Sequence, residues 1–224
     1  MLHPSVFPFL EELRDNNNRD WFKDNKHKHD AARAHVVQFT QALFERLSDV
    51  NQLDGQKVFR VYRDVRFSKN KTPYKSHFGI GFHRIKPQYR GGYYLHLEPG
   101  ASFFGAGFWG PNKDDLFRVR KEIEMDPEYF EKMATAKKLT ETWGAMKGDQ
   151  LKTAPKGFDK EHPGIKTCGL SNISLPKKFR MRCFMIKISS NGWWIILMPY
   201  AHSWITWERC LPQTSTERHS SKSQ

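Results

Sequence analysis

The residues with the most evident chemistry lie in one basic segment, from Lys57 to Lys75. This segment holds seven Lys or Arg residues and a single acid, Asp64. Arg binds carboxylates and phosphates in a bidentate manner, and Lys adds a point charge on a flexible stem. The segment therefore predicts an anion-binding site, to which we assign Arg60, Arg63, Arg66, Lys69, Lys71, Tyr74 and Lys75.

Asp64 is the one acid of this segment, and it has two interpretations. In the first, it is an ion-pair partner that orients Arg63 or Arg66, and the sequence favours this structural role. In the second, it is a general base or a metal ligand. Asp64 therefore stays a candidate catalytic residue at this stage.

Three further titratable residues, His77, His96 and Glu98, fall in segments that predict neighbouring strands. They would coordinate a metal ion if they converged, because imidazole and carboxylate are both zinc ligands. No HxH or HExxH spacing is present, so we predict no metal site. The three residues remain candidate catalytic residues, as a general acid/base pair or as hydrogen-bonded groups in a groove. The sequence indicates no cofactor, so any cofactor is unknown.

The first part of the chain has a helical hydrophobic period. Residues 5–13 predict a short helix with Ser5 as its N-cap, and Asn16 to Asn18 interrupt it. A long second helix is predicted from about residue 18 to residue 48. Its apolar residues recur at steps of three and four, which makes one buried stripe. The stripe consists of Ala32, Val36, Phe39, Leu43 and Leu47.

From residue 58 the hydrophobic period changes to two, which is typical of strands. Strands are predicted at 58–66, 77–84, 93–98 and 102–109, and their short connections favour antiparallel pairing. Two later helices begin at the caps Asn112 and Asp126. The chain therefore predicts an α+β fold, with an antiparallel sheet of about four or more strands and with N-terminal helices and a later helical segment packed on one face.

Alternation assigns the side chains of these strands to two faces. The apolar face carries residues such as Phe78, Ile80, Phe82, Leu95 and Leu97. The opposite face carries the candidate His and Glu residues and four glycines, Gly79, Gly81, Gly105 and Gly107. Glycine weakens a strand interior unless a ligand or another segment approaches the backbone. We therefore expect the polar face to be the floor of a site, with the basic loop closing over it, provided that the strand register is as assigned.

Length and composition limit the classes of protein to which this chain can belong. With 224 residues and 38% hydrophobic residues, the chain is long enough for one domain with its own core. No apolar run approaches the roughly 20 residues of a membrane helix, and the first residues show no signal peptide. The three cysteines have no metal-ligand spacing. We therefore expect a cytoplasmic protein with free thiols and no membrane contact.

The final part of the chain differs from the rest. Residues 166–224 carry nine Lys or Arg and two Glu, so about half of the net charge of +13 belongs to them. They also hold all three cysteines and four of the seven tryptophans. We expect residues 1–165 to form a single α+β domain and residues 166–224 to be an atypical basic tail. Two explanations stay open for the tail, a frameshift in the coding sequence or a genuine segment that is poorly ordered.

Four motifs carry a resemblance to a known family: Asn16–Phe22, Phe59–Lys75, Gly92–Pro99 and Ala154–Asp159. Up to about Ile165, the chain resembles an uncharacterised bacterial and fungal family, domain of unknown function 2461. The resemblance implies a domain of its own. It implies no established activity and no accepted catalytic residues.

Three classes of function remain open. The first is a protein, or an enzyme, that acts on a phosphorylated small molecule or a nucleotide, although no P-loop, GxSxG or GxGxxG motif is present. The second is a nucleic-acid binding module, with Tyr74, Tyr89 and Trp109 as exposed aromatics for base stacking. The third is a non-catalytic structural or protein-interaction domain. The sequence does not indicate the oligomeric state.

Overall fold

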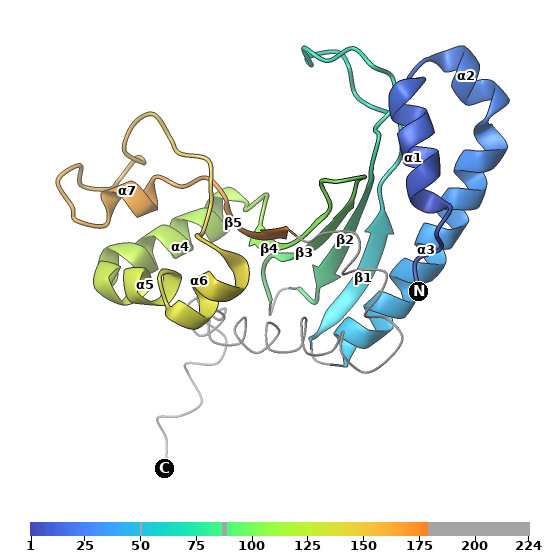
Figure 1. Ribbon diagram of the computed structural model, residues 1–224. Helices are drawn as coiled ribbons and strands as arrows, with labels where there is room; N and C mark the ends of the chain where they lie inside the picture. Colours follow the sequence, from blue (N-terminus) through green and yellow to red (C-terminus); the bar gives the residue numbers. More distant parts are fainter. Residues whose placement is uncertain (50, 87–88, 179–224) are drawn as a thin grey trace. The chain divides into compact units, whose positions relative to one another are not determined.

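The computed structural model describes residues 1–49, 51–86 and 89–178. Five strands form one antiparallel sheet in the order β1-β2-β3-β4-β5, and seven helices accompany them within the described residues (Figure 1), which confirms the predicted α+β class. The elements are α1 (Val6–Asp15), α2 (Arg19–Asp24), α3 (Lys26–Ser48), β1 (Leu53–Val58), β2 (Phe78–Arg84), β3 (Gly92–Leu97), β4 (Phe103–Phe108), α4 (Lys113–Met125), α5 (Pro127–Ala134), α6 (Lys137–Trp143), α7 (Ile165–Cys168) and β5 (Ile173–Lys178).

The described chain divides into two compact units, and the boundary passes through β4. The first unit contains α1 to α3, β1 and most of β2 and β3. The second contains α4 to α7 and most of β5. All the candidate catalytic and anion-binding residues belong to the first unit.

The N-terminal helices differ from the prediction at one point. α1 begins after Ser5 as expected, but the predicted long helix is divided into α2 and α3 at Asn25. The Asn25 side chain donates a hydrogen bond to the Trp21 carbonyl at 3.0 Å and thereby ends α2. Asn side chains compete with the backbone for such carbonyls, which is why Asn favours helix ends over helix interiors. Asn18 caps α2 by accepting from the Trp21 N–H at 2.9 Å.

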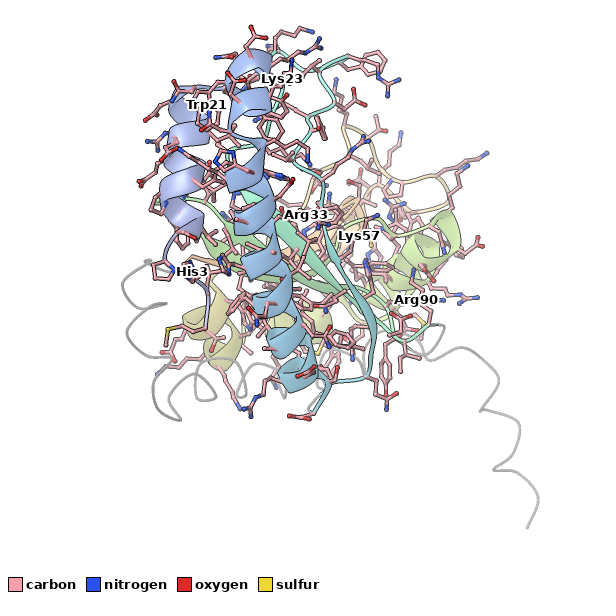
Figure 2. The ribbon with its side chains drawn as sticks, turned by 90° about the vertical axis from the view of Figure 1, so that its right-hand side faces the viewer. His3, Trp21, Lys23, Arg33, Lys57 and Arg90 are labelled. Carbon is pink, nitrogen blue, oxygen red and sulfur yellow. The ribbon has the colours of Figure 1, made fainter. Side chains whose placement is uncertain are left out.

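α3 is the longest helix of the first unit. All five residues of its predicted apolar stripe are buried. The helix packs against α1 and β1, and α1 lies beside it in both views (Figures 1 and 2). Charged residues of these helices, such as Arg33 and Lys23, stay exposed (Figure 2). None of the described helices combines the length and the apolar composition that crossing a membrane requires.

The predicted strand at 58–66 is wrong, because the first strand is β1, which ends at Val58. Residues 59–77, here called the basic arm, connect β1 to β2 (teal in Figure 1). Beyond Phe59, which donates to the Gly79 carbonyl, the arm pairs with itself through the bridge between Tyr62 and Tyr74. The period of two in this segment therefore reflects the two faces of a narrow loop, and not the faces of the sheet.

The other three predicted strands are confirmed as β2, β3 and β4, each within about two residues of its predicted bounds. In the first unit, the predicted apolar face of β2 and β3 is buried. Phe78, Ile80, Phe82, Leu95 and Leu97 have between 0 and 2% of their surface exposed. The Phe78 ring stacks on His29 of α3 with 6.2 Å between centroids, so this face packs on the helices.

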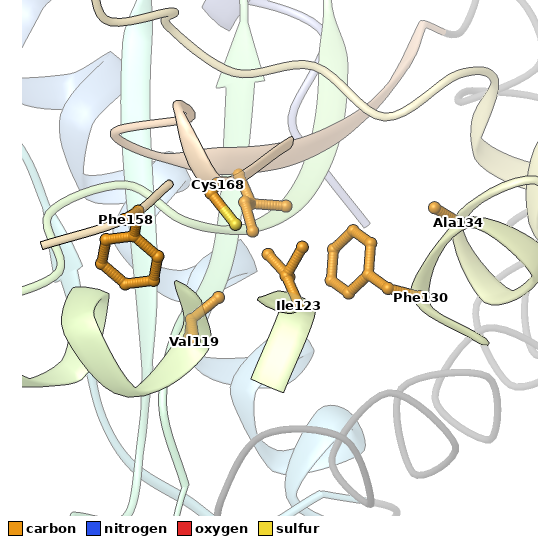
Figure 3. Close-up of a cluster of buried hydrophobic side chains, with 7 residues drawn as sticks. Val119, Ile123, Phe130, Ala134, Phe158 and Cys168 are labelled. Atoms are coloured by element: carbon orange, nitrogen blue, oxygen red, sulfur yellow. The ribbon is translucent and has the colours of Figure 1, made fainter. Parts of the chain in front are cut away.

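The second unit has its own hydrophobic core, formed by α4, α5, α7, β5 and the loop before α7 (Figure 3). Its buried residues are Val119, Ile123, Phe130, Ala134, Phe158, Cys168 and Ile173. The predicted caps are present, since Asn112 accepts from the Asp115 N–H and Asp126 accepts from the Tyr129 N–H. α5 ends at Ala134, before α6 begins.

Regular structure continues past residue 165, through α7 and β5 to residue 178. Cys168 and Ile173 of this stretch contribute to the core of the second unit. Residues 179–224, with Cys183 and Cys210, lie outside the described residues. The frameshift and the poorly ordered tail therefore both stay predictions.

Candidate functional site

The basic arm folds back on itself through two backbone hydrogen bonds that flank its bridge. The Arg63 N–H donates to the Pro73 carbonyl at 2.9 Å, and the Lys75 N–H donates to the Val61 carbonyl at 2.8 Å. Successive side chains of paired extended segments point to opposite faces. Tyr62 and Tyr74 therefore share one face of the arm, and Arg63 and Lys75 share the other.

The tyrosine face anchors the arm to the N-terminal helices. Tyr74 is only 6% exposed, and its ring stacks on Phe22 of α2 with 4.0 Å between centroids. Asn17 holds the Tyr74 backbone from both sides, donating to its carbonyl at 3.0 Å and accepting from its N–H at 3.1 Å. Burial raises the pKa of the Tyr74 hydroxyl. Tyr74 therefore anchors the arm, and it lies on the face of the arm opposite to Arg63 and Lys75.

In the outer half of the arm, two of the cations have partners within the arm. Arg66 makes a bidentate ion pair with Asp64, with Nε to Oδ1 at 3.0 Å and Nη2 to Oδ2 at 2.7 Å. This is the pair that the structural interpretation of Asp64 expects, and it lowers the pKa of that carboxyl. Lys71 donates from Nζ to the Val65 carbonyl at 2.9 Å, and Lys69 is exposed. The outer half thus leaves Arg66 and Lys71 engaged within the arm.

The inner half carries cations of a different kind, Arg60, Arg63 and Lys75, here called the basic cluster. Within residues 1–49, 51–86 and 89–178, none of the three forms an ion pair with an acid. Burial lowers the pKa of Lys75, and the positive charges of Arg60 and Arg63 lower it further. The Arg63 Nε is buried and has no hydrogen-bond partner among the described residues. The basic cluster is therefore a concentration of like charge without a close ion pair, although Asp64, whose pKa is lowered mainly by Arg66, also interacts with the charge of Arg60.

His77, His96 and Glu98, here called the His–Glu cluster, come together in the first unit. Their candidate ligand atoms all lie within 4.8 Å of one another. The His96 Nε2 is 2.9 Å from the Glu98 Oε2, and the His77 and His96 rings are 4.1 Å apart. His96 lies on β3, Glu98 directly follows that strand, and His77 directly precedes β2. The register of two paired strands is therefore what brings the three side chains together.

Aromatic and hydroxyl groups support this cluster. The Tyr94 Oη lies 3.3 Å from the His96 Nδ1, and the Phe103 ring stacks on His96 at 4.9 Å and 16°. The Ser102 hydroxyl donates to the Glu98 carbonyl at 2.7 Å and accepts from the Glu98 N–H at 3.0 Å. The His96 side chain is 12% exposed and the Glu98 side chain 31%, so the carboxylate lies nearer to solvent.

One glycine of this face in the first unit, Gly79, leaves space that a neighbouring side chain occupies, whereas the contact at Gly81 is an ordinary one. A Cβ atom on Gly79 would lie 2.5 Å from the Tyr94 Oη. A Cβ atom on Gly81 would lie 3.5 Å from the Phe59 ring. In the first unit, the space above Gly79 and Gly81 is therefore next to the chain's own aromatic rings, those of Tyr94 and Phe59.

Burial and the neighbouring charges determine the protonation state of His77. Burial lowers the pKa of His77 to about 4, and the neighbouring His96 adds to this, whereas Glu98 opposes it. The charges of Lys75 and Arg63 also lower the pKa of His77, so the basic cluster acts on the His–Glu cluster. Near pH 7 the His77 imidazole is therefore neutral and has a free lone pair on one nitrogen.

Two site residues were missed by sequence reasoning. Phe103 stacks on His96, and alternation along β4 from the apolar Phe104 would have placed it on the polar face. Phe67 is 95% exposed near the outer end of the arm, and only its position between Arg66 and Lys69 marks it in the sequence. Asp64, by contrast, has no hydrogen bond or ion pair to the His–Glu cluster among the described residues, because it is bound to Arg66.

Comparison with known proteins gives one match. The family model described as "Conserved hypothetical protein (DUF2461)" matches residues 5–187. The chain belongs to this family. The match includes both clusters and extends beyond Ile165, where the resemblance was expected to end. No curated protein and no solved structure matches the chain. The description of the family names no activity, so the function has to be argued from the site.

Proposed function

We propose that this chain binds a phosphorylated small molecule or a nucleotide at the basic cluster of Arg60, Arg63 and Lys75. The observation that carries the proposal is a group of three cations that form no ion pair within the described residues, although Arg60 also interacts with Asp64 at longer range. Their mutual repulsion destabilises the charged form of Lys75. A bound multivalent anion would offset that repulsion and give the Arg63 guanidinium hydrogen bonds.

The neighbouring His–Glu cluster supports a catalytic use of such an anion. The positive charges of Lys75 and Arg63 lower the pKa of His77, so the basic cluster and the His–Glu cluster are close enough to interact electrostatically. His96 and Glu98 form a 2.9 Å hydrogen bond, which makes them the candidate general acid/base pair of this environment. The proposed reaction class is proton transfer at an atom of the bound phosphorylated compound.

Calorimetric titration with inorganic pyrophosphate and with ADP tests the anion site. We expect saturable binding to the wild-type chain, and at least about tenfold weaker binding to Arg63→Ala and Lys75→Ala, since a charged hydrogen bond contributes about 1.5–3 kcal/mol. Arg66→Ala is the matched control, because Arg66 is an exposed arginine of the same arm that is paired with Asp64. Equal weakening in all three variants, or no binding to wild type, would contradict the proposal and favour a non-catalytic interaction domain.

A second candidate function, binding of single-stranded nucleic acid, rests on Phe67. This ring is 95% exposed and lies among the cations of the outer arm, an arrangement suited to stacking a base beside phosphate contacts. Two of the three aromatics that the sequence offered support it less, since Tyr74 is buried and Tyr89 lies under the Arg84 guanidinium at 4.5 Å. The third, Trp109, is 45% exposed but belongs to the second unit. We expect Phe67→Ala to weaken oligonucleotide binding by about 1–3 kcal/mol if this function is correct. Affinity that does not fall with rising salt would exclude it.

The proposal includes a cytoplasmic location. Its support is chemical, because Cys168 is a free, buried thiol, as is usual in a reducing compartment. Fractionation of cells that produce the chain from its natural gene would test this directly.

A further inference from the structure

Two imidazoles and one carboxylate converge in the first unit, and their candidate ligand atoms lie within 4.8 Å of one another. From this convergence we infer that His77, His96 and Glu98 bind one divalent transition-metal ion. The same donor set occurs in catalytic zinc sites and in non-haem iron(II) sites, where it leaves further coordination positions open. This inference replaces the prediction of no metal, which rested on the absence of a local motif.

The spacing of the donors suits a single ion. The His96 Nε2 and the Glu98 Oε2 are 2.9 Å apart. Two ligand atoms bound at about 2.1 Å in adjacent octahedral positions lie about 3.0 Å from each other. The distance between these two donor atoms therefore matches that of two ligands of one ion, and a small reorientation of the His96 ring would direct its Nε2 lone pair to the ion. Two ligand atoms of one ion lie at most about 4.2 Å apart, and the candidate atoms span up to 4.8 Å. The His77 ring, whose centroid is 4.1 Å from that of His96, would therefore have to rotate to provide the third donor.

The surroundings of the donors are an independent argument. A metal-bound histidine usually directs its other nitrogen to a hydrogen-bond partner, which fixes the ring and its tautomer. His96 has this arrangement, since Tyr94 Oη lies 3.3 Å from Nδ1 while Nε2 faces Glu98. Phe103 stacks on the same ring, and Ser102 holds the backbone of Glu98. These contacts hold the His96 ring and the Glu98 backbone in place, so that the two donor atoms face each other.

The chemistry of the donors selects the class of ion. Imidazole suits zinc, iron(II), manganese(II) and cobalt(II), whereas magnesium and calcium prefer oxygen donors alone. The inference uses only the His–Glu cluster and does not depend on the anion site. A variant that loses pyrophosphate binding through Arg63→Ala is therefore expected to keep its affinity for the metal.

Cobalt(II) is the probe that tests the site, because its visible absorption reports coordination directly. The full chain is treated with a chelator, dialysed into phosphate-free buffer and titrated with cobalt chloride. We expect one cobalt per chain, with a dissociation constant at least about 100-fold higher in His96→Gln and Glu98→Gln. His83→Gln is the matched control, because His83 is an exposed histidine of β2 outside the cluster, and it should bind like wild type.

Glu98→Gln keeps the test decisive even if a histidine variant fails to fold. Glutamine has the shape of glutamate and can still hydrogen-bond His96, so circular dichroism should report an intact fold. If the His–Glu cluster were only a structural hydrogen-bond network, Glu98→Gln would leave cobalt binding unchanged, and that result would overturn the inference. Absence of saturable cobalt binding to the wild-type chain would overturn it as well.

Discussion

The two faces of β2 and β3 in the first unit carry opposite kinds of side chains on the same two strands. One face buries Phe78, Ile80 and Phe82 with 0 to 2% exposure, and it packs on α3. The other face has His96 and Tyr94 between partly buried polar neighbours, and its glycines leave room for aromatic rings. Strand alternation alone separates these two surfaces, which are a few ångström apart.

The difference indicates that the apolar face serves stability, and it leaves the polar face available for the proposed binding. Burial of the apolar face removes large side chains from water, and each contributes free energy to folding. Half-buried titratable groups, such as the histidines of the polar face, carry a desolvation cost. Such groups are therefore expected where a ligand, and not the core, completes the interactions.

The largest expected effect is on the apolar face. Phe82 is 1% exposed, so Phe82→Ala removes a full aromatic side chain and leaves a cavity. We expect the free energy of unfolding to fall by about 3–5 kcal/mol, measured by urea denaturation. A loss below about 1 kcal/mol would mean that the face is not part of the core, and the comparison between the faces would fail.

The second-largest effect on stability is expected at Gly79 of β2, next to the Tyr94 ring on the polar face. In Gly79→Ala the new Cβ would lie 2.5 Å from the Tyr94 Oη, so that ring must move away. We expect a loss of about 1–3 kcal/mol in unfolding free energy. The double variant Gly79→Ala/Tyr94→Phe should recover part of it, because the hydroxyl in conflict is gone. Additive losses in the double variant would argue against this contact.

A smaller effect on stability is expected in the basic cluster. Arg63→Ala removes one like charge near Lys75, so the pKa of Lys75 should rise, as followed by NMR of its side chain. The free energy of unfolding should change by less than about 0.5 kcal/mol, because no ion pair among the described residues is lost. A marked destabilisation would instead indicate that Arg63 serves the fold.

The smallest effect is expected in the outer arm. Arg66 and Asp64 form a solvent-exposed pair, with 76% and 50% of their side chains exposed. Exposed pairs contribute little, because water and salt screen them. Arg66→Ala should leave the thermal midpoint and the binding of pyrophosphate unchanged. A loss of pyrophosphate affinity would move the anion site from the basic cluster to the outer arm.

The sequence predicted the structure correctly where a periodic pattern of apolar residues corresponds to a face that is buried in the fold. The α3 stripe and the strands β2, β3 and β4 were predicted because one face of each is apolar. It failed where a single polar side chain competes with the backbone, as at Asn25. It also failed in the basic arm, whose period of two resembles that of a strand although the segment pairs mainly with itself.

In β2, β3 and β4, the sequence by itself determined which residues share a face, because alternation along a strand is a local property of the backbone. It also determined that cations gather between residues 57 and 75. Only the tertiary structure decided which of these cations find a partner, since Arg66 meets Asp64 while Arg60, Arg63 and Lys75 meet no acid among the described residues. It also decided that His77 meets His96 and Glu98, because that meeting depends on the register between β2 and β3. Register and pairing arise from contacts between distant parts of the chain, and no local pattern specifies them.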